Sequence, residues 1–195
     1  MITPLWALGI LAGALLSILL LANYCFRTPE LWPCSHGTWQ SRLFWLLFRT
    51  LNVSALILAA VDFKPIAEPD FMRLAAAAAA LIGGIFYVAG CVKLGRTNLY
   101  CGNEGLVTAG IYAWSRNPQY AIAMPSYVAL AIAVHSPLLA FLVPLLIAVF
   151  WLMAVNEEPW LESEYGADYV RYKRAVPRFY NVRRLRFLVS ASPAR

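Results

Sequence analysis

Four polar residues that could bind a small molecule flank two apolar segments in the second half of the chain. Arg116 and Asn117 come just before the first segment, and Glu157 and Glu158 come just after the second. Only residues 135–137 separate the two segments, so we expect a tight antiparallel helical hairpin. In such a hairpin the two polar ends lie side by side, and the sequence therefore predicts one polar pocket at its mouth.

The predicted pocket has the groups to hold a ligand that bears both an amine and a carboxylate. Arg116 could bind a carboxylate, and the two glutamates could accept hydrogen bonds from an ammonium. The side chains of Tyr112, Trp114 and Tyr120 could cover a flat or cationic portion of the same ligand. S-adenosylmethionine combines these features, whereas the glycine motif G-x-G-x-x-G of Rossmann methyltransferases is absent. Taken alone, the glutamate pair could equally be a solvated helix end.

Helices that cross a membrane must position these residues. Of the 195 residues, 61% are hydrophobic and 13% are charged, and the mean hydropathy is +0.63. A soluble domain carries about 25% charged residues. The chain instead predicts an all-α, polytopic membrane bundle of about five transmembrane helices, in which Pro125 and Pro144 kink the two short helices of the C-terminal hairpin. The five apolar segments cover residues 5–24, 43–61, 71–92, 120–134 and 138–155.

The distribution of lysine and arginine over the predicted loops indicates an orientation. With five crossings, 13 of these residues fall on the side of the C-terminal tail, and only Lys64 and Arg73 fall on the other side. Loops rich in these residues face the cytoplasm. We therefore expect the N-terminus outside, and the C-terminal tail and the active site in the cytoplasm.

The chain after the fifth segment divides into an amphipathic part and a basic part. Leu161, Tyr165, Tyr169 and Tyr172 recur at three- and four-residue spacing, which predicts an amphipathic helix. Residues 178–189 then interleave arginines with aromatic and aliphatic side chains, a composition typical of a segment on the cytoplasmic membrane surface. We expect three parts: N-terminal transmembrane helices at 1–92, a core with the loop, hairpin and tail helix at 93–179, and a basic amphipathic tail at 180–195.

Composition argues against nucleic-acid and metal partners. The net charge is +6, but anionic lipid headgroups attract this charge as well as nucleic acid does, and the chain has no RNA-binding signature. The two histidines and four cysteines form no C-x-x-C pair and no zinc constellation, so we expect no metal. The cysteines are Cys25, Cys34, Cys91 and Cys101.

Two stretches, at 105–120 and 156–179, resemble the superfamily of integral membrane methyltransferases that includes isoprenylcysteine carboxyl methyltransferases and phospholipid methyltransferases. The two stretches keep the superfamily's order, with the helical hairpin between them. The matching positions are Leu106, Val107, Gly110, Tyr112, Arg116, Pro118, Tyr120, Glu157, Glu158, Glu164, Tyr165, Gly166, Tyr169 and Tyr172.

The resemblance implies an S-adenosylmethionine-dependent enzyme that methylates an apolar or lipid-like acceptor, such as a prenylcysteine carboxylate or a lipid amine. The acceptor would enter from the bilayer through a lateral opening. Arg116 and Glu158 would be catalytic. Asn117 stands where the best-known members have histidine, and it keeps hydrogen bonding but loses titration near neutral pH. The cofactor would contact Leu106, Val107, Gly110, Tyr112, Arg116, Asn117, Pro118, Tyr120, Glu157 and Glu158.

Arg49 and Asn52 are candidates for contact with the acceptor. Arg49 lies about seven residues inside the second apolar segment, about 10 Å from its cytoplasmic end, and Asn52 follows on the same face. Charged residues within a membrane often serve a function, although Arg49 could simply extend to the interface. Two other classes stay open for the whole chain: a sterol-reductase-like membrane reductase that uses NADPH, and a non-catalytic membrane protein. The sequence leaves the oligomeric state open.

Overall fold

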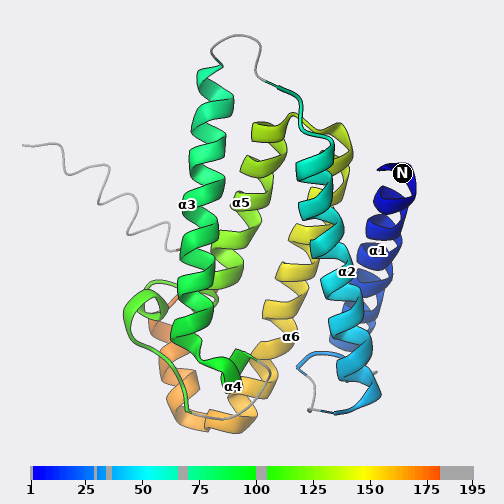
Figure 1. The fold of residues 1–195 in the computed structure, drawn as a ribbon. Coiled ribbons are helices and arrows are strands. Elements are labelled where there is room, and N and C mark those ends of the chain that lie inside the picture. Colours follow the sequence, from blue (N-terminus) through cyan, green and yellow to red (C-terminus); the bar gives the residue numbers. More distant parts are fainter. Residues whose placement is uncertain (1, 29, 34–36, 66–69, 100–104, 181–195) are drawn as a thin grey trace, which may run out of the picture.

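A computed structural model describes residues 2–28, 30–33, 37–65, 70–99 and 105–180, and within these ranges every regular element is a helix (Figure 1). Helices α1, α2, α3 and α6 are long and apolar enough to cross a membrane, and α5 is a shorter apolar helix of 17 residues. The prediction of an all-helical membrane bundle is confirmed. The elements are α1 (Ile2–Phe26), α2 (Trp39–Val61), α3 (Phe71–Leu94), α4 (Arg96–Leu99), the 3-10 helix η1 (Gly110–Ala113), α5 (Pro118–Val134) and α6 (Pro137–Ala175).

Side chains cap the starts of three spanning helices. Thr38, Asp70 and Ser136 each accept a hydrogen bond from a backbone N–H three residues later, at 3.0–3.2 Å. These bonds satisfy donors that a helix start leaves free. Helix α5 begins differently, because Pro118 in its first turn has no N–H and Asn117 makes no capping bond. The Asn117 side chain is therefore free to bind elsewhere.

Helices α5 and α6 form the tight hairpin that the sequence predicted (Figure 1). His135 ends α5 in the left-handed conformation, with φ at 55°, and Ser136 caps α6. The Ser136 hydroxyl also donates to Asp62 Oδ2 at 2.5 Å, which ties the hairpin turn to the end of α2. Both helices stay continuous through Pro125 and Pro144.

Helix α6 is longer than the fifth apolar segment. It runs for 39 residues, through the glutamate pair and into the predicted amphipathic helix. The break falls at Gly166, which has non-helical angles of φ 50° and ψ −127°, a conformation that glycine adopts easily. Beyond Gly166 the chain turns back toward the segment that leads into α5 (Figure 1). The apolar part of α6, up to Val155, is thus followed by a part that can cover the mouth of the hairpin.

Helix α6 lies in the middle of the bundle. Helices α1, α2 and α5 pack against it, and α3 packs on α5 (Figure 1). Side chains of α6 such as Leu142 and Leu146 are fully buried. Helix α3 approaches α5 closely at Gly83, where an added Cβ would lie 2.0 Å from Ser126 Oγ, whereas Gly84 faces open space. The alanine- and glycine-rich sequence of α3 therefore allows close helix packing.

Arg73 caps the end of α5 at the membrane face opposite the hairpin mouth. Its Nε donates to the Ala133 carbonyl at 3.0 Å, and its terminal nitrogens donate to the carbonyls of Lys64 and Pro65. A cation stabilises the C-terminal end of a helix, where carbonyls lack partners. Arg73 is therefore a buried structural residue rather than a free loop charge.

Candidate active site

A polar pocket forms where the start of α5 meets the end of the apolar part of α6. It encloses about 70 Å³. The beginning of α5, the segment before it and both parts of α6 supply most of its walls, and α3 and α4 contribute one residue each. The lining residues are Leu94, Asn98, Gly105, Leu106, Val107, Tyr112, Arg116, Asn117, Gln119, Tyr120, Glu157, Trp160, Leu161, Tyr165, Tyr169 and Tyr172.

Glu158 lies at the centre of a cationic cluster beside this pocket. Arg178 donates to both of its carboxylate oxygens, from Nε at 2.6 Å and from a terminal nitrogen at 2.8 Å. Arg116 approaches within 3.0 Å and Lys173 within 3.7 Å. Burial alone would raise the pKa of the Glu158 carboxyl, but the hydrogen bonds from Arg178 and the charges of these three cations hold the pKa below its ordinary value. Glu158 is therefore ionised and already neutralised by the protein.

Glu157 has a different environment, although it is the next residue. Its Oε2 accepts a hydrogen bond from the Tyr120 hydroxyl at 3.3 Å. No cation pairs with it among the residues that the structure describes. Burial raises the pKa of Glu157 to about 7, even though the hydrogen bond from Tyr120 opposes the shift. The pocket is thus lined by an acidic side chain that can take up or release a proton near neutral pH and that has no positive partner in the part of the chain that the structure describes.

Two hydrogen-bond donors in the pocket wall are not used within the described ranges. The Nε of Arg116 and the hydroxyl of Tyr112 are buried and make no hydrogen bond there. The rest of the Arg116 guanidinium is held in place, because a terminal nitrogen contacts Glu158 and also donates to the Tyr169 hydroxyl at 3.3 Å. A buried donor without a partner is costly, and a ligand that accepts hydrogen bonds would remove this cost.

The segment at 176–180, here called the C-terminal strap, lies directly on the start of α5. The backbone N–H groups of Arg116 and Asn117 donate to the carbonyls of Pro177 and Arg178, at 2.9 and 3.1 Å. The Asn117 side chain also donates to the Arg178 carbonyl, at 3.3 Å, and the Tyr180 hydroxyl donates to the carbonyl of Ala121. Asn117 therefore binds the strap, which places Arg178 beside Glu158.

The second part of α6 fastens the segment before α5 through its tyrosines. The Tyr172 hydroxyl donates to the Tyr112 carbonyl at 2.6 Å. Tyr169 is almost fully buried beside Arg116. The predicted amphipathic spacing is real, but its apolar face covers the pocket and packs on Leu106 rather than lying on lipid.

Four other residues were predicted to contact the cofactor, and two of them line the pocket. Leu106 and Val107 line the pocket. Gly110 opens η1 with φ at 67°, which favours glycine, and Pro118 starts α5; neither lines the pocket.

The structure does not bring Arg49 and Asn52 into one site. Helix α2 begins at Trp39, so Arg49 lies ten residues inside it rather than seven. The Arg49 side chain is exposed on the surface of α2, with its guanidinium carbon 5.5 Å from the centre of the Trp45 ring. Asn52 instead lines a large cavity and accepts a hydrogen bond from the Tyr127 hydroxyl at 2.6 Å.

That second cavity, here called the apolar cavity, has a volume of about 750 Å³ and lies between α2, α3, α5 and α6. Its lining residues Leu56, Leu81 and Val88 are 55%, 68% and 60% exposed, so the cavity opens sideways between α2 and α3. The ring of Phe150 closes the end nearest the polar pocket, with its centre 5.8 Å from that of Tyr120. Phe150 lines the apolar cavity and Tyr120 lines the polar pocket, so this ring pair separates the two spaces.

Sequence reasoning missed Arg178 and Lys173 as neighbours of Glu158. It assigned Arg178 to a membrane-surface segment, and the structure corrects this, because Arg178 faces Glu158. A signal was present: Arg178 directly follows Val176 and Pro177, a non-helical pair that ends the amphipathic helix.

Several predictions fall outside the described residues or stay untested. Cys34, Cys101 and the basic tail from 181 onward lie outside those ranges. Cys25 and Cys91 are free thiols, and no group of His, Cys, Asp and Glu that could hold a metal occurs in the described ranges. The division into parts at 1–92, 93–179 and 180–195 remains a prediction.

Comparison with known proteins identifies the family of the chain. A family model described as phospholipid methyltransferase matches residues 71–168, which is half of the chain. The matched region starts at α3 and contains Arg116, Asn117 and both glutamates. No curated protein and no solved structure shows significant similarity to this chain. Together, the family match and the apolar helices show that the chain belongs to the phospholipid methyltransferase family and is an integral membrane methyltransferase.

Proposed function

We propose that the protein transfers a methyl group from S-adenosylmethionine to a lipophilic acceptor, and that the polar pocket holds the amino-acid end of this cofactor. One observation carries the proposal. Among the described residues, the pocket combines a carboxylate without a cationic partner, on Glu157, with buried donors on Arg116 and Tyr112 that make no hydrogen bond. An ammonium would bind Glu157 and a carboxylate would bind the two donors, so this wall complements a zwitterion.

The pocket must widen to accept the whole cofactor. Its volume of about 70 Å³ is well below the roughly 300 Å³ at which ligand pockets begin. The second part of α6 covers it, and the C-terminal strap, which continues from that part, lies on the start of α5. Hydrogen bonds and a small apolar cluster around Tyr169 and Tyr172, rather than spanning helices, hold both. We expect these two elements to move when the cofactor binds, as closing segments do in many enzymes.

The cofactor would supply an electrophilic methyl group on a positively charged sulfur. An acceptor atom would take this methyl with its own electron pair as the carbon–sulfur bond broke, and the electron pair of that bond would stay on sulfur. A carboxylate acceptor would have no proton to lose, whereas an amine acceptor would release one to solvent. Arg116 and Glu157 would orient the reacting partners, and the aromatic walls would exclude water. We assign Glu158 a positioning role, because a carboxylate neutralised by three cations with a lowered pKa is a poor proton acceptor. It holds Arg116 and Arg178 in place.

The apolar cavity would take the hydrocarbon part of the acceptor. Its walls are mainly apolar and it opens toward the surrounding lipid. The Tyr120–Phe150 ring pair stands between it and the polar pocket, so these rings must part for the reacting end of the acceptor to reach the methyl group. Both a lipid amine and a prenylated carboxylate would fit this arrangement.

We further propose that the polar pocket faces the cytoplasm and that the N-terminus lies outside. The start of α2, the end of α3 and the end of α6 share one end of the bundle with the pocket (Figure 1). Most lysines and arginines of the chain belong to that side. A reporter protein that fluoresces only in the cytoplasm, fused to the C-terminus, tests this orientation. A dark fusion with full expression would refute it.

Binding of radiolabelled S-adenosylmethionine to the purified protein in detergent tests the cofactor. We expect saturable binding by the wild type and at least tenfold weaker binding by E157Q, because a hydrogen bond to a charged group contributes about 1.5–3 kcal/mol. D168N is the matched control, since among the described residues Asp168 forms an ion pair only with exposed Arg171 on the same helix. Absence of saturable binding by the wild type would refute the proposal, and saturable NADPH binding instead would favour a reductase.

A further inference from the structure

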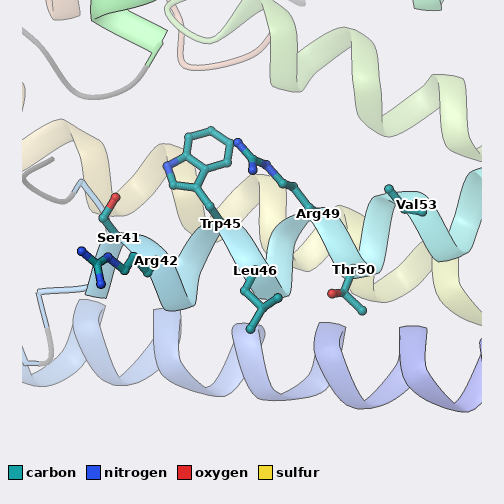
Figure 2. Close-up of a pocket in the computed structure, with 7 residues that line it drawn as sticks. All are labelled: Ser41, Arg42, Trp45, Leu46, Arg49, Thr50 and Val53. Atoms are coloured by element: carbon teal, nitrogen blue, oxygen red, sulfur yellow. The ribbon is translucent and has the colours of Figure 1, made fainter. Parts of the chain in front are cut away.

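The cytoplasmic half of α2, in the proposed orientation, carries a groove that the methyl-transfer proposal does not use. The groove has a volume of about 540 Å³ and is lined by residues of α2 (Figure 2). Arg42, Leu46, Arg49 and Val53 follow one another at spacings of four, three and four, which places them on one face of the helix. Two cations therefore alternate with two aliphatic side chains along a single stripe.

The groove is positively charged without compensation. No acidic residue lines it, and neither Arg42 nor Arg49 takes part in an ion pair in the described ranges. Figure 2 shows the Arg49 side chain reaching back over the Trp45 ring, toward the start of α2. This contact shields one face of the guanidinium but supplies no hydrogen-bond acceptor.

The depth of Arg49 makes this charge significant. Ten residues of helix place its Cα about 15 Å along α2 from Trp39, and its side chain turns back over Trp45 toward the start of the helix. A guanidinium at this depth must extend to the interface or meet an anion. Leu46 and Val53, next to it on the stripe, are 63% and 51% exposed and present apolar surface to the lipid.

We propose that the α2 groove binds an anionic phospholipid, with the lipid headgroup along the side of α2 that carries Arg42 and Arg49 and its acyl chains along Leu46 and Val53. A guanidinium binds phosphate through two parallel hydrogen bonds. The apolar half of the stripe favours a lipid over soluble phosphate, because only the lipid also covers Leu46 and Val53. A zwitterionic lipid binds less well, since its ammonium finds no carboxylate in the groove.

Competition between two lipids tests the proposal. The purified full-length protein in detergent receives equal amounts of phosphatidylglycerol and phosphatidylcholine, and native mass spectrometry counts the lipids that stay bound. A basic residue near the surface favours an anionic lipid by about fivefold, so two arginines predict a preference between about fivefold and 25-fold. R42Q/R49Q should bring the ratio of bound lipids close to one.

R171Q/R174Q is the matched control, since it removes the same charge from exposed positions of α6. It should keep the wild-type ratio. The proposal is overturned by a wild-type ratio near one, by a preference that survives in R42Q/R49Q, or by an equal loss in the control. If R42Q/R49Q aggregates, R49Q alone should lose part of the preference for phosphatidylglycerol, and high salt should reduce this preference in the wild type. A full preference in R49Q, or in the wild type at high salt, also overturns the proposal. No arm involves methyl transfer, so failure here leaves the proposed function untouched.

Discussion

Cofactor binding should exchange protons with solvent, and the direction of exchange should reverse with pH. Glu157 lies past the apolar part of α6, and burial raises its pKa to about 7. If the cofactor's ammonium pairs with Glu157, the carboxyl must give up its proton on binding. The ligand's own amino group, with an ordinary pKa of about 7.8, must instead be protonated in the complex.

These two requirements set the size of the effect. At pH 6 nearly all of the Glu157 carboxyl is protonated and nearly all of the amine is charged, so binding should release about 0.9 proton. At pH 8 about a tenth of the Glu157 carboxyl is still protonated and about 0.6 of the amine is uncharged. Binding should therefore release about 0.1 proton and take up about 0.6, a net uptake of about 0.5 proton. The sign should change at about pH 7.4, midway between the two pKa values.

Calorimetry in buffers of different ionisation enthalpy measures this exchange directly. E157Q keeps the amine's uptake and loses the carboxyl's release, so its exchange should be near zero at pH 6 and an uptake at pH 8. The reasoning is refuted if wild type and E157Q exchange the same number of protons at pH 6. If E157Q binds too weakly to measure, the absence of proton release by the wild type at pH 6 refutes it equally.

Three further predictions concern stability and acceptor selection. E158Q should lower the unfolding free energy by about 3–5 kcal/mol, because it leaves buried Arg116 facing two other cations. R178Q should lower the unfolding free energy by only about 1–2 kcal/mol, since the Arg178 side chain is 35% exposed. Thermal unfolding in detergent compares the two variants, and a larger loss of stability in R178Q than in E158Q would contradict the cluster described for Glu158. G83A should destabilise α3 against α5 by about 1–3 kcal/mol, whereas G84A should be neutral or slightly stabilising; equal midpoints for the two would show that α3 packs differently. Y127F removes the hydrogen bond to Asn52 inside the apolar cavity. It should raise KM for a lipophilic acceptor and leave S-adenosylmethionine binding unchanged. An unchanged KM would show that Asn52 does not contact the acceptor.

Local patterns in the sequence were sufficient to predict the bundle. Long apolar segments need no tertiary information to be read as spanning helices. The three-residue gap at 135–137 allows only a tight turn, so the sequence alone predicts the helical hairpin. Because the hairpin places its two flanks together, Arg116 and Glu158 could be paired before their contact at 3.0 Å was seen.

The contact between Arg178 and Glu158 was not predicted from the sequence, because it depends on the backbone conformation of one residue, Gly166. Arg178 reaches Glu158 because Gly166 breaks α6 and the chain turns back. A glycine in a polar helix is compatible with either a straight or a broken helix, so spacing alone could not reveal the reversal. The separation of Arg49 from Asn52 has a similar cause. The two residues differ by 60° around α2, and only the packing of neighbouring helices decides which direction faces the cavity.

The hydrogen bonds between the C-terminal strap and the start of α5 have a consequence for biogenesis. The strap follows the last spanning helix in the chain, yet its carbonyls bind Arg116 and Asn117, which are synthesised about 60 residues earlier. At a translation rate of about 5–20 residues per second, the last apolar segment, which ends at Val155, is synthesised about 1–4 seconds before the strap. During that interval Glu158 lacks Arg178, and the strap does not yet bind Arg116 and Asn117. Membrane insertion and formation of the Glu158–Arg178 contact are therefore separate events, and we expect a chain truncated before Arg178 to integrate into the membrane without this contact.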